Sequence, residues 1–289
     1  MTDTFSVLQR AQALLATGRA EQALTELSTL TANEVTSPYA MQLRCAALSR
    51  LDRWAEVGDA ARAGLAASGP DPDLLLWLGR AEHEAGRDEA AERVLLDGLA
   101  LAPHDVDLLC AYADLCLAHG QLDKAAKLVE LAAARAPQAP VVYATRIQIA
   151  HARGDHREAQ RISREFVGVH PENPAAHALL GGTSAARGQV DAAYEGFRQA
   201  AAARPTERAF AESAMELRVA RHPLMLPLRP ILRFGAIKTW LVAVALILLL
   251  RTAGLPVLAG LLGFAWLAYC VYSWVVPPLV RRWVLRMWR

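Results

Sequence analysis

A spacing of 34 residues constrains this chain more than any other feature of its sequence. Glycine recurs at that interval, alanine follows each glycine by five residues, and proline follows it by seventeen. The positions are Gly86, Gly120, Gly154 and Gly188; Ala91, Ala125, Ala159 and Ala193; and Pro103, Pro137, Pro171 and Pro205. A fixed period of this length is typical of repeat proteins, whose units must stack to bury their apolar faces.

The register extends toward the N-terminus in a weaker form. Gly18 and Ala23 fit it, whereas Asp52 stands at the intervening glycine position. The first two units are therefore predicted to be degenerate copies of the later four.

Each unit is predicted to contain two helices. In the unit that starts near residue 73, an apolar stripe with helical spacing is formed by Leu75, Leu78 and Ala81. Gly86 would end the first helix, because glycine readily adopts a positive φ. Small Ala91 would let the second helix (89–101) approach closely, and Pro103 would stop it.

This helix–turn–helix unit resembles the tetratricopeptide repeat (TPR) family. In the clearest unit the matching residues are Leu78, Gly79, Gly86, Ala91, Leu95 and Pro103. The resemblance covers residues 4–206 as six units and implies an all-α, right-handed superhelix with a concave groove that binds peptides or partner domains. Residues 206–222 are predicted to form a capping helix that buries Phe210, Ala214 and Leu217.

Charge divides the chain into two parts. The net charge is +2, from 31 Lys and Arg against 29 Asp and Glu. Eight of the basic residues and none of the acidic ones follow residue 222, so residues 1–222 hold 23 basic against 29 acidic side chains, a net of −6. Such asymmetry indicates two different surroundings. The acidic front part argues against a nucleic-acid partner, because phosphate binding requires a basic face.

The rear part is predicted to be a membrane anchor. A basic linker, residues 223–233, is kept from forming a regular helix by Pro223, Pro227 and Pro230. A transmembrane hairpin follows over residues 234–280, with spans at 234–250 and 255–276 that are about 25 and 33 Å long, against a hydrocarbon core of about 30 Å. The alternatives are a single span with an interfacial segment, and a buried hairpin in a soluble protein.

Basic residues predict the orientation of this hairpin. Those expected at the membrane interface are Arg229, Arg233, Lys238, Arg281, Arg282, Arg286 and Arg289, whereas the turn between the spans has only Arg251. The positive-inside rule then places both termini and the repeats in the cytoplasm. Residues 281–289 would form a basic amphipathic tail on an anionic leaflet. Scarce lysine and abundant alanine are typical of GC-rich bacteria, so we expect a multi-pass protein of a bacterial inner (plasma) membrane.

No catalytic or metal-binding pattern is evident. The histidines are scattered, and His151 and His156, five residues apart, would not share one helix face. No C-x-x-C pair occurs among the four cysteines, and no nucleophile-elbow, zinc-protease or phosphate-loop motif is present. We therefore expect neither enzymatic activity nor a cofactor or metal.

The resemblance places a partner-binding groove on the inner faces of the first helices. The residues expected there are Asp73, Leu76, Arg80, His83, Asp107, Cys110, Asp114, Gln148 and His151, with Ala144 and Gly182 among small neighbours. Asp107 and Asp114 would repel a carboxylate, so the expected protein or peptide partner is neutral or basic. The alternative is that these are ordinary solvated helix faces.

The sequence therefore predicts a membrane-anchored TPR scaffold or adaptor that binds a partner in the cytoplasm and holds it at the membrane. The alternative is a subunit or assembly factor of a membrane transport or envelope-biogenesis complex. Neither the oligomeric state nor the partner's identity can be predicted.

Overall fold

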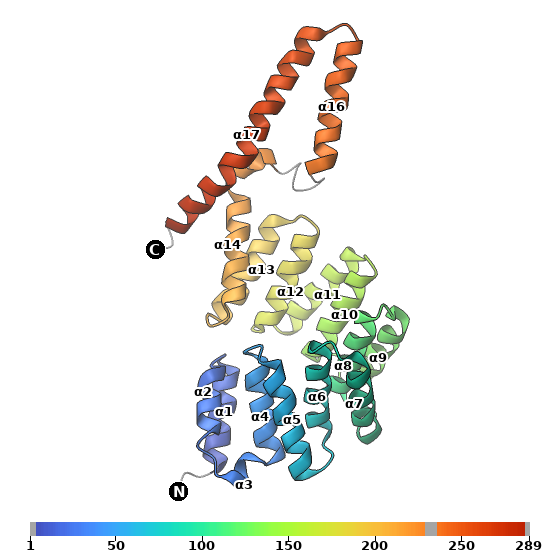
Figure 1. Ribbon diagram of the computed structural model, residues 1–289, viewed down its shortest axis with the longest axis vertical. Coiled ribbons are helices and arrows are strands. Elements are labelled where there is room, and N and C mark those ends of the chain that lie inside the picture. Colours follow the sequence, from blue (N-terminus) through green and yellow to red (C-terminus); the bar gives the residue numbers. More distant parts are fainter. Residues whose placement is uncertain (1–3, 229–235, 287–289) are drawn as a thin grey trace.

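The computed structural model describes residues 4–228 and 236–286, and every regular element in these ranges is a helix (Figure 1). The chain forms six helix pairs stacked in a superhelix, then a capping helix and a hairpin. The pairs are α1 (Thr4–Ala16) and α2 (Ala20–Leu27), α4 (Pro38–Ser49) and α5 (Trp54–Ser68), α6 (Pro72–Glu84) and α7 (Asp88–Leu101), α8 (Val106–Ala118) and α9 (Leu122–Arg135), α10 (Pro140–Ala152) and α11 (His156–Val169), and α12 (Pro174–Ala186) and α13 (Val190–Ala203). A short helix, α3 (Ala32–Val35), links the first two pairs. The predicted all-α repeat fold is confirmed.

Local chemistry sets where the helices begin and end. Proline opens α4, α6, α10 and α12, where its missing N–H costs nothing. At the N-termini of α6 and α8, the carboxylates of Asp71 and Asp105 accept hydrogen bonds from the backbone amides of Leu74 and Leu108, at 2.9 and 2.8 Å. The repeating turn glycines have φ between 69° and 74°, as predicted, and Asp52 takes the same conformation with φ 55°.

The helices form two layers. Each first helix packs on the next first helix, from α4 through α6, α8 and α10 to α12. No comparable contact joins successive second helices in the described part of the chain; they pack on the first helices beside them. The first helices are therefore the inner layer of the curved array, and their free faces line its concave side.

The core of the array differs in detail from the predicted stripe. In α6 the buried residues include Leu74, Leu76, Leu78 and Ala81, whereas Leu75 is only partly buried. The reason is that α6 is enclosed by α5, α7 and the neighbouring first helices, so it buries more than one face. The small residues at the predicted crossing points, Ala91, Ala125, Ala159 and Ala193, are all fully buried.

The two ends of the array meet. The turn between α1 and α2 lies against the loop that joins α13 to the capping helix α14 (Arg208–Arg221), so a methyl group added at Gly18 would overlap with Oγ1 of Thr206. Arg50, in the turn after α4, is near the same loop. Burial and the charge of Arg204 lower the pKa of Arg50, while the charge of Glu207 raises it. The superhelix thus closes on itself around its concave side.

The hairpin stands beyond the capping helix at one end of the molecule (Figure 1). It consists of α16 (Ala236–Thr252) and α17 (Pro256–Arg286), which pack on each other. The predicted linker contains a 3₁₀ helix, η1 (Pro223–Leu228), and α17 continues through Pro277 and Pro278 instead of ending at residue 276. Residues 281–286, predicted as a separate tail, are therefore the end of α17. In the capping helix only Ala214 is buried; Phe210 and Leu217 are partly exposed.

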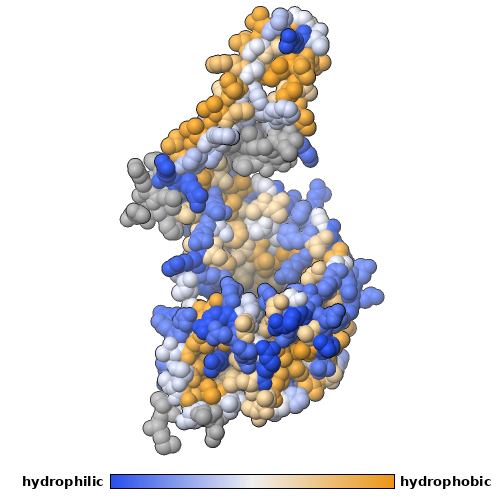
Figure 2. Space-filling model, viewed as in Figure 1, coloured by the Kyte–Doolittle hydropathy of each residue, from blue (hydrophilic) through white to orange (hydrophobic). Residues whose placement is uncertain are grey.

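One helix in the described ranges is long and apolar enough to cross a membrane, over Pro256–Arg282 of α17. The first predicted span corresponds to α16, which has 17 residues and is shorter. Large apolar side chains cover the outside of both helices, including Trp240, Phe264 and Trp274. Figure 2 shows the resulting contrast between a hydrophobic hairpin and a largely hydrophilic repeat array.

Candidate partner-binding groove

The predicted groove residues lie on three consecutive first helices of the inner layer. Asp73, Arg80 and His83 project from α6, Asp107 and Asp114 from α8, and Gln148 and His151 from α10. Figure 2 shows the middle of the array as a recess with apolar residues in its floor and polar residues around it.

The structure brings the carboxylates of α6 and α8 together. Asp73 and Asp107 are exposed to solvent, yet surrounding protein desolvates both carboxylates and raises their pKa. The charges of Asp71, Asp105 and Asp107 raise the pKa of Asp73 further. Exposure combined with desolvation is expected of side chains standing in a concave surface.

Arg80 is the cation inside this acidic cluster. Its charge opposes the rise in pKa at both Asp107 and Asp114, and its guanidinium lies 5.6 Å from the ring centroid of Trp77. Gln42 of α4 donates a hydrogen bond of 3.0 Å to Oδ2 of Asp73. Arg80 thus acts on two of the three carboxylates, and the cluster keeps an excess of negative charge.

Asp114 is the most enclosed carboxylate of the set. Burial raises its pKa to about 6, against the opposing charge of Arg80. Its Oδ1 atom is buried without a hydrogen bond of standard geometry, as is the hydroxyl of Thr145, which is 1% exposed on the adjacent helix α10. Thr145 nevertheless lies close enough to lower the pKa of Asp114 slightly. A buried, incompletely paired carboxylate is costly and favours an incoming positive charge.

Two other predicted groove residues are inside the core. Leu76 is 6% exposed and Cys110 is fully buried, so both support the groove from beneath. Burial raises the pKa of the Cys110 thiol to about 12, which makes it a poor nucleophile. Gln148 is exposed on the inner layer.

Histidines that are separate in sequence meet in the fold. His151 and His156 do not share one helix face, because they belong to α10 and α11, yet their Nδ1 atoms lie 3.3 Å apart across the turn between these helices. Burial, and then the charge of His156, lower the pKa of His151. His83 and His119 similarly flank Asp88, at 2.7 and 3.2 Å.

Sequence reasoning missed Thr145, Gln42 and the capping residues Asp71 and Asp105. Thr145 is on a buried face of α10, where the apolar pattern gives no reason to select it. Asp71 and Asp105 could have been found, because each stands just before a first helix and is followed two residues later by a second aspartate.

The predicted interface residues are only partly described. Lys238, Arg281 and Arg282 are exposed on the hairpin. Arg229, Arg233 and Arg289 lie outside the described residues, and for Arg286 only its place at the end of α17 is described.

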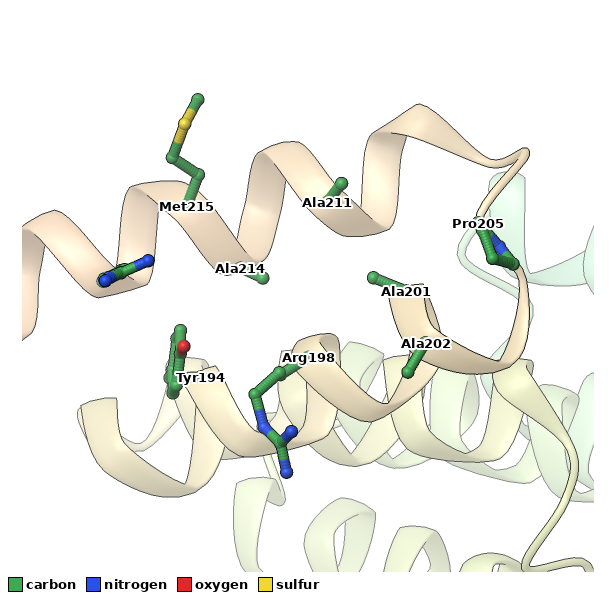
Figure 3. Close-up of a pocket in the computed structure, with 9 residues that line it drawn as sticks. Tyr194, Arg198, Ala201, Ala202, Pro205, Ala211, Ala214 and Met215 are labelled. Atoms are coloured by element: carbon green, nitrogen blue, oxygen red, sulfur yellow. The ribbon is translucent and has the colours of Figure 1, made fainter. Parts of the chain in front are cut away.

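A second concavity lies between α13 and α14, with a volume of about 370 Å³. Figure 3 shows that alanines line it, with Tyr194 and Met215 at its side. Arg198 at its rim pairs with Glu195, and nearby Arg221 pairs with Asp191 at 2.6 Å. Two arginines at or beside this concavity, Arg198 and Arg221, are thus already paired with carboxylates of the same chain. Within the described ranges, no group of three or more His, Cys, Asp or Glu could hold a metal ion.

Two segments match models of the tetratricopeptide repeat, residues 72–115 and residues 145–208. No curated protein matches the sequence significantly. Solved structures share the fold at low identity. A tetratricopeptide repeat protein from Parabacteroides merdae is 13% identical with a TM-score of 0.61, covering 74% of this chain and 84% of its own.

Two further structures are similar. A thermophilic TPR protein of Thermus thermophilus is 15% identical with a TM-score of 0.58, covering 63% of this chain and all of its own. The human IFIT1 dimer, solved with PPP-AAAA, is 17% identical with a TM-score of 0.61, covering 99% of this chain and 73% of its own. At these identities the likeness concerns the fold alone. The chain therefore contains tetratricopeptide repeats arranged in a TPR-like superhelix, which imply a protein-interaction scaffold.

Proposed function

We propose that this chain is a membrane-anchored scaffold whose groove binds a basic segment of a partner protein and holds that partner at the cytoplasmic face of a bacterial inner membrane. The acidic cluster supports this most directly. Asp73, Asp107 and Asp114 stand on the inner layer with Arg80 as the cation among them. A lysine or arginine from a partner would relieve the repulsion between Asp73 and Asp107 and pair with the partly desolvated Asp114.

The same charges disfavour other partners. A C-terminal carboxylate or a nucleic-acid phosphate would add negative charge to a concave surface that already carries an excess of negative charge. TPR-fold proteins are generally non-catalytic scaffolds, and the raised pKa of Cys110 offers no activated nucleophile in this groove.

The hairpin supports membrane anchoring. Many of its large apolar side chains are exposed on both helices, which is unfavourable for a monomer in water and favourable in lipid. Lys238 and Arg251 lie near the two ends of α16 rather than at its centre. Because no Asp, Glu, Lys, Arg or His lies midway along either helix, an anchor is favoured over a transport subunit, in which such charged residues mark ion or substrate paths.

Fractionation tests the anchor. The full chain should remain in membranes after an alkaline carbonate wash, whereas a chain ending at residue 222 should not. Reporters fused at residue 1 and at residue 289 should both signal the cytoplasm. Release of the full chain by carbonate, or an external signal from either terminus, would contradict the proposed arrangement.

Binding of a short oligolysine peptide tests the groove. We expect Asp107→Asn combined with Asp114→Asn to weaken binding by about tenfold, since two partly exposed charge pairs contribute about 0.5–1 kcal/mol each. The control is Asp97→Asn combined with Glu130→Gln, which removes two charges from exposed positions on the second helices α7 and α9. Equal weakening by both pairs would show that net charge, not the groove, attracts the peptide.

A further inference from the structure

The junction between the array and the hairpin is apolar. The 3₁₀ helix η1 has the sequence PLMLPL, without a charged side chain, and it packs on both α14 and α17. Met225 is buried in the structure, but the side chain of Leu224 is 50% exposed. An apolar segment is thus uncovered where the polar array ends.

Two tyrosines of α17 satisfy backbone carbonyls of η1. The hydroxyl of Tyr272 donates to the carbonyl oxygen of Leu224 at 2.5 Å, and the hydroxyl of Tyr269 donates to that of Pro227 at 2.7 Å. At a water-facing junction solvent could bond to these carbonyls. In hydrocarbon no such partner exists, and irregular backbone there needs partners from the protein.

Two amide donors of η1 have acceptors as well. The amide of Leu224 donates to Nδ1 of His222 at 3.3 Å, and that of Met225 donates to the carbonyl oxygen of His222 at 2.8 Å. Pro223 and Pro227 have no N–H at all. Two carbonyls and two amides of this segment are therefore satisfied within the protein, which lowers the cost of moving it out of water.

The position of the tyrosines along α17 gives a depth. Tyr269 and Tyr272 follow Pro256 by 13 and 16 residues, which is about 20 and 24 Å along the helix axis. A hydrocarbon core about 30 Å thick that starts at Pro256 would therefore end about 6–10 Å beyond them. Interfacial apolar elements commonly insert about 5–10 Å.

We propose that η1 is embedded in the bilayer on the side of the array, so that the repeats are held directly against the membrane surface. The inference rests on the proposed membrane anchor. It also agrees with the rest of α17: Trp274, 84% exposed, falls at about 27 Å, where Trp favours the interface, and Arg281 falls at about 38 Å, among headgroups.

Depth-dependent quenching tests the proposal on the full chain in vesicles of phosphatidylcholine and phosphatidylglycerol. Cys270, in the hairpin, is first replaced by serine; the other three cysteines are buried. An environment-sensitive fluorophore is attached at Leu224→Cys, and brominated lipids serve as shallow and deep quenchers. We expect strong quenching by the shallow bromines and weak quenching by the deep ones.

Two control positions separate this inference from the anchor itself. Leu101→Cys, 52% exposed on the array, should not be quenched, and Leu267→Cys, 63% exposed in the hairpin, should be quenched by deep bromines. Quenching at 267 without quenching at 224 would overturn the embedding of η1 and leave the anchor standing. No quenching at 267 would overturn both.

The tyrosines provide a second test. Tyr269→Phe combined with Tyr272→Phe removes both donors while keeping the rings, so the label at 224 should move toward water and lose at least half of its quenching. Tyr39→Phe, on α4 of the array, should leave it unchanged. An unaltered label in the double variant would show that these hydroxyls do not hold η1 in the bilayer.

Discussion

The contact between the two ends of the array can be tested with a matched pair of glycines. Gly18 and Gly120 occupy the same turn position and have φ of 76° and 70°. Alanine at either site should cost about 1–2 kcal/mol, because a side chain is disfavoured in the left-handed region. A Cβ at Gly120 has nothing within 4 Å, whereas at Gly18 it overlaps with Oγ1 of Thr206.

Gly18→Ala should therefore be more destabilising than Gly120→Ala, by about 1–3 kcal/mol of additional overpacking if the ends stay together. The measurement is the denaturation midpoint of the full chain in mild detergent, followed by circular dichroism. Thr206→Ala should relieve the additional loss at Gly18 and have no influence on Gly120→Ala, as expected for residues in contact and residues far apart.

Equal losses for the two glycine variants, both unaffected by Thr206→Ala, would refute the closed array. The groove would then be an open surface, and the charge of Arg204 would no longer lower the pKa of Arg50.

Three further predictions follow from single positions. Asp52→Gly should stabilise the chain by up to about 1 kcal/mol in a denaturation experiment, because Asp52 has a positive φ of 55°; no gain would mean that its side chain compensates the strain. Gly196→Ala should cost about 2–3 kcal/mol of stability, because its Cβ would lie 2.7 Å from the backbone N of Gly181. Gly182→Ala, whose Cβ would enter open space, should stabilise the helix by up to about 1 kcal/mol. A larger loss of stability for Gly182→Ala than for Gly196→Ala would contradict the packing of α12 on α13. Because burial raises the folded pKa of Asp114 to about 6, above the unfolded value, the folded chain binds the extra proton. Stability should therefore fall as the pH rises from about 4 to 6, with Asp114 contributing on the order of 2 kcal/mol. Asp114→Asn should reduce that slope, whereas Asp73 and Asp107, whose pKa values are also raised, keep a part of it; an unchanged slope would exclude Asp114 as a source.

The repeat fold could be predicted because its strongest signals are local. A glycine that ends a helix with positive φ, and a proline that stops the next one, act through their own backbone, so Gly86 and Pro103 locate a turn and a helix end without tertiary information. Helix faces were harder to predict. Helical spacing predicts Leu75 in the buried stripe, but contacts on several sides of α6 bury Leu74 and Leu76 instead.

The candidate site was predictable as a set of positions but not as an environment. The resemblance to TPR proteins, applied in the register of the repeats, placed Asp107 and Asp114 on the inner layer. Nothing local indicates that Asp114 loses more solvent than Asp107, or that Thr145 stands beside it, because both depend on how α8 packs on α10. The contact of His151 with His156 likewise arises from the turn between two helices.

The central claim is that a partner is held in the groove while the chain is in the membrane. A photo-reactive amino acid placed at Gln148, exposed on the inner layer, should cross-link a protein that is recovered in the membrane fraction. The same amino acid at Leu131, exposed on the outer helix α9, should cross-link little. Cross-linking that is equal at the two positions, or a product found only in the soluble fraction, would contradict the account.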